Sequence, residues 1–398
     1  MRANTATHYG SVAKTFHWLT ALLIATVIPL GIIANGLPFE TSEELARKAF
    51  LFSLHKTVGL AVFFVALARI AWAMAQEKPG LLTAEKPVQA FLASAVHWLL
   101  YGSLLLVPLT GWIHHAATTG FAPIWWPFGQ SLPFVPKDVG LAETFAGLHL
   151  VFERVLVLAL VLHIAGALKH HFIDRDATLL RMLPGDHAVP HVAAHRRHLA
   201  PPLAAVAIWA GAVGVGGAVG VYSHDEGVQR GPALETVQSD WAVRDGTIAI
   251  TVRQLGSDVS GSFGEWTAAI SFDPEVSEGE AGTAEVTINI ASLELGSVTS
   301  QALGADFFDA ATFPTATYAG PIVATPDSLI VDGTLTIRDI AQPIPLPFTL
   351  EITDGVATAA GEVIIDRRAF DVGLNQNDEG TLGFEVLASI TLTADQPE

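Results

Sequence analysis

Four histidines lie in long apolar stretches of the sequence, where an unpaired polar side chain is costly. They are His17, His55, His149 and His163. A histidine inside a membrane-spanning segment indicates a specific role, and its neutral imidazole is a common ligand of metal ions. A hydrogen bond to a neighbouring helix explains one such residue. Four of them require a common explanation, which depends on the elements that carry them.

The first half of the chain contains five apolar stretches that are long enough to cross a membrane. About 20 apolar helical residues span a hydrocarbon core of roughly 30 Å. The stretches cover residues 17–36, 54–74, 91–115, 143–168 and 199–223. With a mean hydropathy of +0.44 and only 15% charged residues, the chain is too apolar for a wholly cytosolic enzyme. Arg69, near the end of the second stretch, is expected to extend to the membrane surface.

The basic residues of the short loops indicate how the chain is oriented. Most of them, such as Lys14 and Arg175, lie on the side of the amino terminus, and only Arg47, Lys48 and Lys137 are clearly on the other. Because Lys and Arg accumulate on the cytoplasmic side, we expect a cytoplasmic amino terminus. Five crossings then place the carboxy-terminal half outside. In a bacterium this is a multi-pass protein of the inner membrane with a periplasmic carboxy-terminal domain.

The expected depths of the four histidines place them in two pairs. His17 and His163 lie near the cytoplasmic face, and His55 and His149 near the outer face. His163 follows His149 by 14 residues, which is about 21 Å along a helix and within about 40° on one helix face. Two levels with two imidazoles each are what two b haems require. We therefore predict that His17 and His163 bind an inner haem iron, and His55 and His149 an outer one. Interhelical hydrogen bonds remain the alternative.

Other histidines have roles that the sequence leaves open. His97 begins the third stretch, where a haem propionate, a quinone or an interhelical hydrogen bond would each explain it. His191, His195 and His198 share one helix face, which allows a metal site. The neighbouring Arg196 would repel a cation, and the loop already contributes to topology.

Three glycines and a pair of histidines could also lie near a haem. Gly59, Gly147 and Gly166 are on the helices that carry predicted ligands, where close helix packing or room for a porphyrin would explain them. His170 and His171 lie at the inner end of the fourth stretch and suit contacts with propionates or lipid headgroups.

The two halves of the chain differ sharply in charge. Residues 1–200 hold 15 Lys and Arg against 11 Asp and Glu, whereas residues 201–398 hold 6 Arg, no Lys and 28 Asp and Glu. No region is strongly basic, so a nucleic acid is not expected as a partner. The chain has no cysteine, which excludes disulfides, iron–sulfur clusters and covalently attached c-type haem.

The acidic half has the alternating pattern of β-strands. Apolar residues recur at every second position over residues 286–290, 346–352 and 382–392. Turns are expected at three dipeptides that tolerate positive φ: Asp245-Gly246, Asp332-Gly333 and Asp354-Gly355. About eight short strands over this length predict a closed antiparallel barrel or a sandwich.

The membrane half resembles the bacterial cytochrome b561 family over about residues 8–185. The resemblance rests on residues 16–18 (FHW), 54–59 (LHKTVG), 97–98 (HW), the interval from His149 to His163, and residues 167–184. It implies a four-helix bundle with two haem b groups, whose ligands map to His17, His55, His149 and His163. It also implies electron exchange with ubiquinone, and some members are similar to superoxide oxidases. The fifth apolar stretch, residues 199–223, departs from the family.

The acidic half resembles the YceI family of lipocalin-like, polyisoprenoid-binding periplasmic proteins over about residues 235–395. The matching segments are residues 261–263, 272–275, 305–309, 313–318, 333–339 and 365–371. The family implies an eight-stranded antiparallel barrel whose apolar lumen holds an isoprenoid tail. Six aromatic residues are candidates to line this lumen, although each would also suit an ordinary core: Phe263, Trp266, Phe307, Phe308, Phe313 and Phe348.

Taken together, the expected architecture is an all-α dihaem membrane bundle followed by an all-β barrel. The expected parts are a cytochrome domain (1–185), a cytoplasmic loop (186–198), a fifth transmembrane helix (199–223), a linker (224–234) and a barrel (235–398). The expected function is electron transfer to or from ubiquinone, as an oxidoreductase with an unidentified partner protein, while the barrel binds quinone or another polyisoprenoid. Lys56, with Arg47 and Lys48, is expected to attract an anion such as superoxide to the outer haem. The alternative is an isoprenoid-binding or delivery protein whose cytochrome is an anchor or redox sensor.

Overall fold

The computed structural model describes residues 2–82, 85–118, 120–185, 189, 198–222, 234, 237 and 239–396. His191 and His195, and with them the predicted metal-binding stripe, lie outside these residues. The chain divides into two compact units. The helical unit comprises residues 1–36, 50–117 and 123–224, and the β unit comprises residues 37–49, 118–122 and 225–398.

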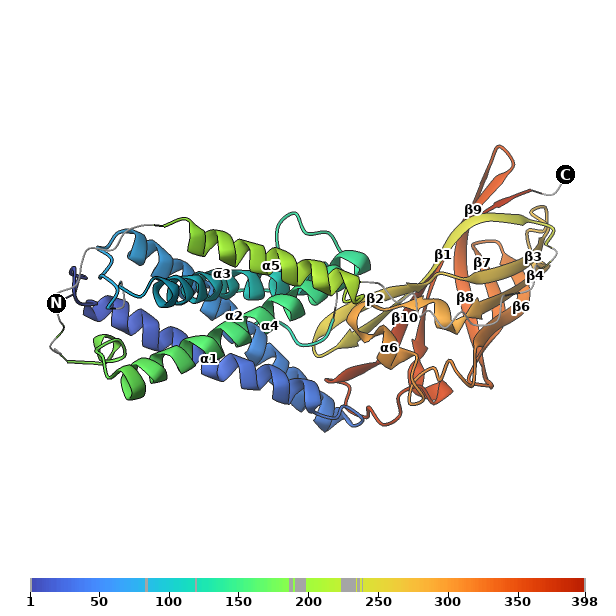
Figure 1. The fold of residues 1–398 in the computed structure, drawn as a ribbon. Helices are drawn as coiled ribbons and strands as arrows, with labels where there is room; N and C mark the ends of the chain where they lie inside the picture. The colour runs from blue at the N-terminus through green and yellow to red at the C-terminus, as the bar shows by residue number, and fades with distance from the viewer. Residues whose placement is uncertain are drawn as a thin grey trace. The chain divides into compact units, whose positions relative to one another are not determined.

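Five long apolar helices make up the membrane-spanning part of the chain (Figure 1). They are α1 (Ser11–Gly36), α2 (Ser42–Met74), α3 (Pro87–Ala117), α4 (Val139–Lys169) and α5 (Ala200–Ala218). Each is long and apolar enough to cross a membrane, so the chain is a multi-pass membrane protein. The predicted apolar stretches lie within these helices or overlap them, and most helices extend beyond them. Asp138 caps α4 by accepting a hydrogen bond from the Leu141 amide, 2.6 Å away.

Helix α5, the predicted fifth span, packs against α3 and α4. The Trp209 ring of α5 lies over Gly102, and its Nε1 donates to the Ser103 hydroxyl at 3.2 Å. The ring of Tyr222, just beyond α5, packs on Gly147, where an added Cβ would lie 2.7 Å from the Tyr222 ring. Gly147 therefore serves close packing of α5, one of the two roles that the sequence left open.

The β unit is built on one curled antiparallel sheet of ten strands (Figure 1). The strands are β1 (Ala242–Gln254), β2 (Ser257–Phe263), β3 (Trp266–Phe272), β4 (Gly279–Asn289), β5 (Leu293–Glu294), β6 (Thr315–Thr325), β7 (Ser328–Ile337), β8 (Ile340–Thr353), β9 (Val356–Asp366) and β10 (Leu382–Asp395). Their order is β3-β4-β6-β7-β8-β9-β10-β1-β2-β5, and a short helix, α6 (Thr299–Ala302), lies between β5 and β6 in the sequence.

The predicted count of eight strands is wrong, because two long strands are each divided by a bend. Residues 257–272 bend at Gly264-Glu265, so that β2 pairs with β1 and β3 pairs with β4. Residues 279–294 are interrupted by a 3-10 turn at Ile290–Ser292. The order of hydrogen-bonded strands consequently begins at β3 and ends at β5, and these two end strands are not paired with each other in the described sheet. Two backbone hydrogen bonds span the bends, from Gly264 to Ser292 and from Asn289 to Glu265, each 3.0 Å long.

Only one of the three predicted Asp-Gly turns forms. Asp354 and Gly355 have φ of 50° and 78° and connect β8 to β9. Gly246 lies inside β1 instead, where an added Cβ would be 2.8 Å from the Trp266 ring. Gly333 lies inside β7, where a Cβ would be 2.3 Å from the Tyr318 ring. These two glycines allow an aromatic ring to approach the strand closely.

Candidate functional site

The two histidines predicted at the outer level are held by the same arrangement on different helix pairs. His55 of α2 donates from Nδ1 to the Val27 carbonyl of α1, at 2.9 Å. His149 of α4 donates from Nδ1 to the Val107 carbonyl of α3, at 2.8 Å. The carbonyl oxygen can only accept, so the proton is on Nδ1 in both rings and Nε2 keeps its lone pair. Metal-bound histidines show this second hydrogen bond, which fixes the ring and frees Nε2 for the metal.

Each of these two rings also lies against a glycine one turn beyond its carbonyl partner. An added Cβ on Gly31 would lie 2.8 Å from His55 Cε1, and one on Gly111 would lie 2.9 Å from His149 Nδ1. A side chain at either position would displace the imidazole. At each of the two histidines, the facing helix thus supplies a carbonyl and, four residues later, a glycine.

The two histidines predicted at the inner level face one another. The ring centroids of His17 in α1 and His163 in α4 are 6.1 Å apart, with an interplanar angle of 56°. Two imidazoles that each bind one metal ion at about 2 Å have centroids about 6 Å apart. The separation therefore fits a single iron between the rings. Neither ring is held as at the outer level, because His17 Nδ1 faces the guanidinium of Arg69 rather than a carbonyl.

His97 of α3 joins the inner pair but has a different geometry. Its ring centroid is 5.0 Å from that of His163, at 87°, which is an edge-to-face contact too close for an iron between them. Its Nδ1 donates to the Ala93 carbonyl of its own helix at 2.6 Å. His97 therefore packs beside the inner pair and is not placed as a third ligand.

Arg69 is a functional candidate that the sequence reasoning missed. The sequence predicts that its side chain extends to the membrane surface, but in the structure it packs within the bundle. Its Nη2 lies 3.5 Å from His17 Nδ1, and its guanidinium lies over the Tyr101 ring at 5.2 Å. The sequence signal was present, because an arginine within a membrane span usually faces protein or a polar group.

Of the small residues predicted near a haem, none contacts a predicted ligand. Gly59 has only Val27 nearby, Gly147 holds Tyr222, and an added Cβ on Gly166 would meet nothing within 4 Å. The glycines that contact the ligand histidines are Gly31 and Gly111. Lys56 also differs from expectation, since it is only 8% exposed and offers no exposed charge to an approaching anion.

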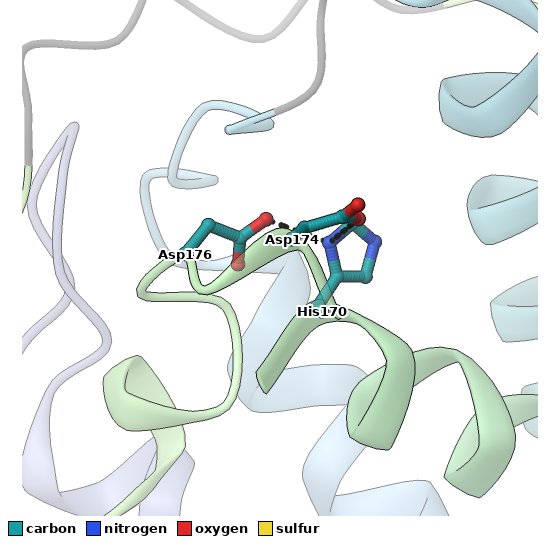
Figure 2. Close-up of side chains that lie close together, drawn as sticks. All are labelled: His170, Asp174 and Asp176. Carbon is teal, nitrogen blue, oxygen red and sulfur yellow. Dashed lines mark hydrogen bonds and ion pairs between the residues drawn. The ribbon is translucent and has the colours of Figure 1, made fainter. Parts of the chain in front are cut away.

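A second polar cluster lies at the end of α4, in the π-helical turn His170–Asp174 (Figure 2). His170 Nδ1 is 2.7 Å from Asp176 and 3.2 Å from Asp174. The ligand atoms of the three side chains lie within 4.8 Å of one another, a spacing that would suit a metal ion. The ammonium of Lys169 is already 2.6 Å from Asp174, however. The cluster is thus explained as an ion-paired helix end, and His170 pairs with carboxylates here.

The curled sheet encloses an apolar cavity of about 290 Å³. Four of the six predicted aromatics line it: Phe263, Phe307, Phe308 and Phe348. Trp266 and Phe313 lie elsewhere, Trp266 against Gly246 and Phe313 beneath the Arg338 guanidinium. The other lining residues are mainly Val, Ile, Leu and Ala from the inward faces of the strands. Such a cavity can hold an apolar chain and exclude water from it.

Comparison with known proteins matches the two halves of the chain separately. The Prokaryotic cytochrome b561 family profile covers residues 8–185, and the YceI-like domain profile covers residues 241–394. Cytochrome b561 homolog 2 of Escherichia coli is 34% identical over 182 residues, which are 45% of this chain and 93% of that protein. A Yersinia pestis protein named probable superoxide oxidase CybB is 26% identical over 178 residues, 44% of this chain and 96% of that protein.

Among solved structures, Burkholderia cenocepacia BcnA is 31% identical, with a TM-score of 0.35, and covers 37% of this chain and 96% of its own. The Campylobacter jejuni YceI protein is 24% identical, with a TM-score of 0.31, over 35% of this chain and 86% of its own. The family profiles and the Escherichia coli relative account for both halves. The chain therefore belongs to the prokaryotic cytochrome b561 family and carries, after its b561 domain, a YceI-like domain.

Proposed function

We propose that the helical unit holds two b haems and exchanges electrons with ubiquinone, while the β unit binds quinone or another isoprenoid lipid. The family implies b-type haem. The observation that carries the proposal is the arrangement of the four histidines. His55 and His149 are oriented by carbonyl groups with Nε2 free, and His17 and His163 are 6.1 Å apart. Bound at these two positions, the haems would supply one-electron transfer.

The residues of this chain have distinct tasks in the proposed sites. The carbonyls of Val27 and Val107 fix the rings of His55 and His149, and Gly31 and Gly111 leave room for them. At the outer level, therefore, the facing helices themselves set the ring positions of both ligands.

Haem content and ligand variants test the proposed sites. We expect purified protein to contain two b haems per chain by pyridine haemochrome analysis. His163→Ala should remove mainly the inner haem and His55→Ala the outer one, so the two variants should lose spectrally different components. One haem per wild-type chain, or full retention in both variants, would refute the pairing.

Reduced-minus-oxidised spectra distinguish electron transfer from the alternative of a lipid-delivery protein. We expect ubiquinol to reduce the haems, or ubiquinone to oxidise them, within the time of mixing. If neither reacts while the β unit still binds lipid, the cytochrome is an anchor or sensor. Superoxide belongs to the same assay as a candidate donor, because a relative is named a probable superoxide oxidase.

The proposed orientation places the amino terminus in the cytoplasm and the β unit in the periplasm of a bacterial inner membrane. The support is the bias of Lys and Arg in the loops together with five apolar helices. Reporter fusions after Glu398 should be active only in the periplasm, and fusions near Asp186 only in the cytoplasm. A cytoplasmic carboxy terminus would contradict the proposed five crossings.

A further inference from the structure

The cavity of the β unit contains very few polar side chains. Among its lining residues they number five: Trp241, Gln254, Gln301, Tyr318 and Arg367. Among the residues that the structure describes, the lining includes no Asp, Glu, Lys or His. An isoprenoid tail needs no polar partner, so any polar group that is not used by the protein itself is available for a headgroup.

Three of these five side chains are satisfied by the backbone around them. Trp241 Nε1 donates to the Phe272 carbonyl at 2.8 Å. The Tyr318 hydroxyl lies 3.0 Å and 2.9 Å from two carbonyl oxygens, to either of which it can donate. Burial raises the pKa of Tyr318 to about 12, so it stays neutral. Arg367 donates to five backbone carbonyls, which occupy its guanidinium and cover its charge.

Gln254 and Gln301 are the exceptions. Gln254 is only 4% exposed, and its Oε1 is a buried acceptor without a partner in the part of the chain that the structure describes. Gln301 Nε2 is a buried donor, also without a partner among those residues. Buried amide groups are normally hydrogen-bonded, because burying them unpaired costs free energy. Two exceptions on the wall of one cavity suggest that a ligand completes them.

The two amides lie beside one apolar cluster of the cavity wall. Gln254 is the last residue of β1 and pairs with Leu382 of β10. Gln301 lies in α6, next to Ala302. Leu382 and Ala302 are both members of this cluster. A headgroup beside the cluster could use both amides, while its tail occupies the apolar remainder of the cavity.

We propose that Gln254 and Gln301 select an isoprenoid with an uncharged hydroxyl-bearing headgroup, a proposal that rests on the proposed lipid binding of the β unit. The hydroxyl donates to one amide oxygen and accepts from the other amide nitrogen. Exchange of oxygen and nitrogen in both amides together still leaves one donor and one acceptor available. Polyprenols and quinols both offer this chemistry.

An isoprenoid phosphate fits the cavity poorly. A phosphate group needs several N–H donors or cations to replace its water. The only cation of the lining within the described part of the chain is Arg367, whose guanidinium is already hydrogen-bonded to five carbonyls. The cavity therefore excludes a phosphate headgroup and accepts an uncharged hydroxyl headgroup.

Native mass spectrometry of the full-length haem-loaded protein tests the selection. The probes are geranylgeraniol, ubiquinol with a tail of similar length, geranylgeranyl diphosphate and squalene, which has no headgroup. The variants are Gln254→Met and Gln301→Met, which remove the amide but keep its length. Gln342→Met is the control, because Gln342 is half-buried on β8, is not one of the residues that line the cavity, and donates to the Ala369 carbonyl.

We expect wild-type protein to bind geranylgeraniol or ubiquinol at least about tenfold more tightly than geranylgeranyl diphosphate. Each lumen variant should lose about that factor for the hydroxyl probe and leave squalene unchanged, and Gln342→Met should change nothing. The hydroxyl probe that responds to the variants identifies the headgroup as prenol or quinol. Equal binding of hydroxyl probes, diphosphate and squalene, or unchanged binding in both variants, would overturn the selection while lipid binding stands. If no probe binds, the proposed lipid function fails with it.

Discussion

The Nδ1 atom of His149 donates to the carbonyl of Val107 at 2.8 Å, and Gly111, four residues later on the same helix, leaves space for the ring. His55 repeats this relationship with Val27 and Gly31. The repetition on two unrelated helix pairs indicates a requirement for a fixed imidazole with a free Nε2. An interhelical hydrogen bond alone would not require the glycine.

We predict that Gly31→Ala and Gly111→Ala weaken the same haem, namely the one lost in His55→Ala. An added Cβ would lie within 3 Å of the ring at each position, so the ligand must move. Haem occupancy and the reduced-minus-oxidised spectrum measure the effect. Gly166→Ala is the control, because its Cβ would meet nothing within 4 Å. If the two glycine variants affected different haems, His55 and His149 would not share one iron.

A second prediction separates His97 from the inner ligands. His97→Gln should retain two haems per chain, because the 5.0 Å contact with His163 leaves no room for an iron between these rings. His17→Gln should lose the inner haem. Pyridine haemochrome analysis of both variants makes the comparison. Loss of a haem in His97→Gln with retention in His17→Gln would exchange their roles.

The apolar helices and the alternating strands could be predicted from the sequence, because both signals are local. The Asp-Gly turns could not be predicted reliably. Gly246 and Gly333 lie inside strands because the rings of Trp266 and Tyr318 approach them from distant positions in the chain. A dipeptide carries no information about such a partner.

In the candidate site, too, local features could be predicted from the sequence and contacts between distant residues could not. Matched depth along the helices groups the four histidines, but which glycine faces which ring depends on how each helix is rotated. For that reason the sequence does not distinguish Gly31 and Gly111, which contact the ligand rings, from Gly59, Gly147 and Gly166, which do not. That Gln254 and Gln301 line one cavity was also beyond the sequence, since only the folded β unit places residues of β1 and α6 on the same wall.

Arg69 is predicted to raise the reduction potential of the inner haem. Its positive charge lies 3.5 Å from His17 Nδ1 and favours the less positive, reduced state. Arg69→Gln should lower that potential, on the order of tens of millivolts. Potentiometric titration resolves the two haems. Arg154→Gln is the control, because the side chain of Arg154 is 74% exposed. Equal shifts in both variants would show a general charge effect and not a local one.

The cluster at the end of α4 predicts a pH dependence of stability. Burial by itself raises the pKa of Asp176, but hydrogen bonds from Thr178 and His170 hold it below its ordinary value. A carboxylate with a lowered pKa stabilises the folded state at neutral pH, and this contribution is lost as the pH falls through the folded-state pKa. Asp176→Asn should therefore lower the melting temperature at neutral pH, and its difference from wild type should shrink towards acid pH. Asp327→Asn is the control, since this exposed carboxylate has no partner among the described residues. A constant difference at all pH values would contradict the assignment.

Arg367 is predicted to be the main polar support of the carboxy-terminal strands. It is 5% exposed and donates to the carbonyls of Val372, Gly373, Gln376, Leu382 and Gly383. Arg367→Met keeps much of the side-chain volume but removes the side-chain donors to these carbonyls, of which Gly373 keeps the Gln376 amide, at a cost of at least about 3 kcal/mol. Hydrogen exchange of peptides from β9 and β10 should increase in this variant, while the haem spectrum stays unchanged. Arg368→Met is the matched control, because the neighbouring Arg368 is half exposed, pairs with Asp366 at the surface and lies over the Phe384 ring, but donates to none of these carbonyls. Comparable loss of protection in both variants would mean that positive charge, and not the carbonyl network, stabilises these strands.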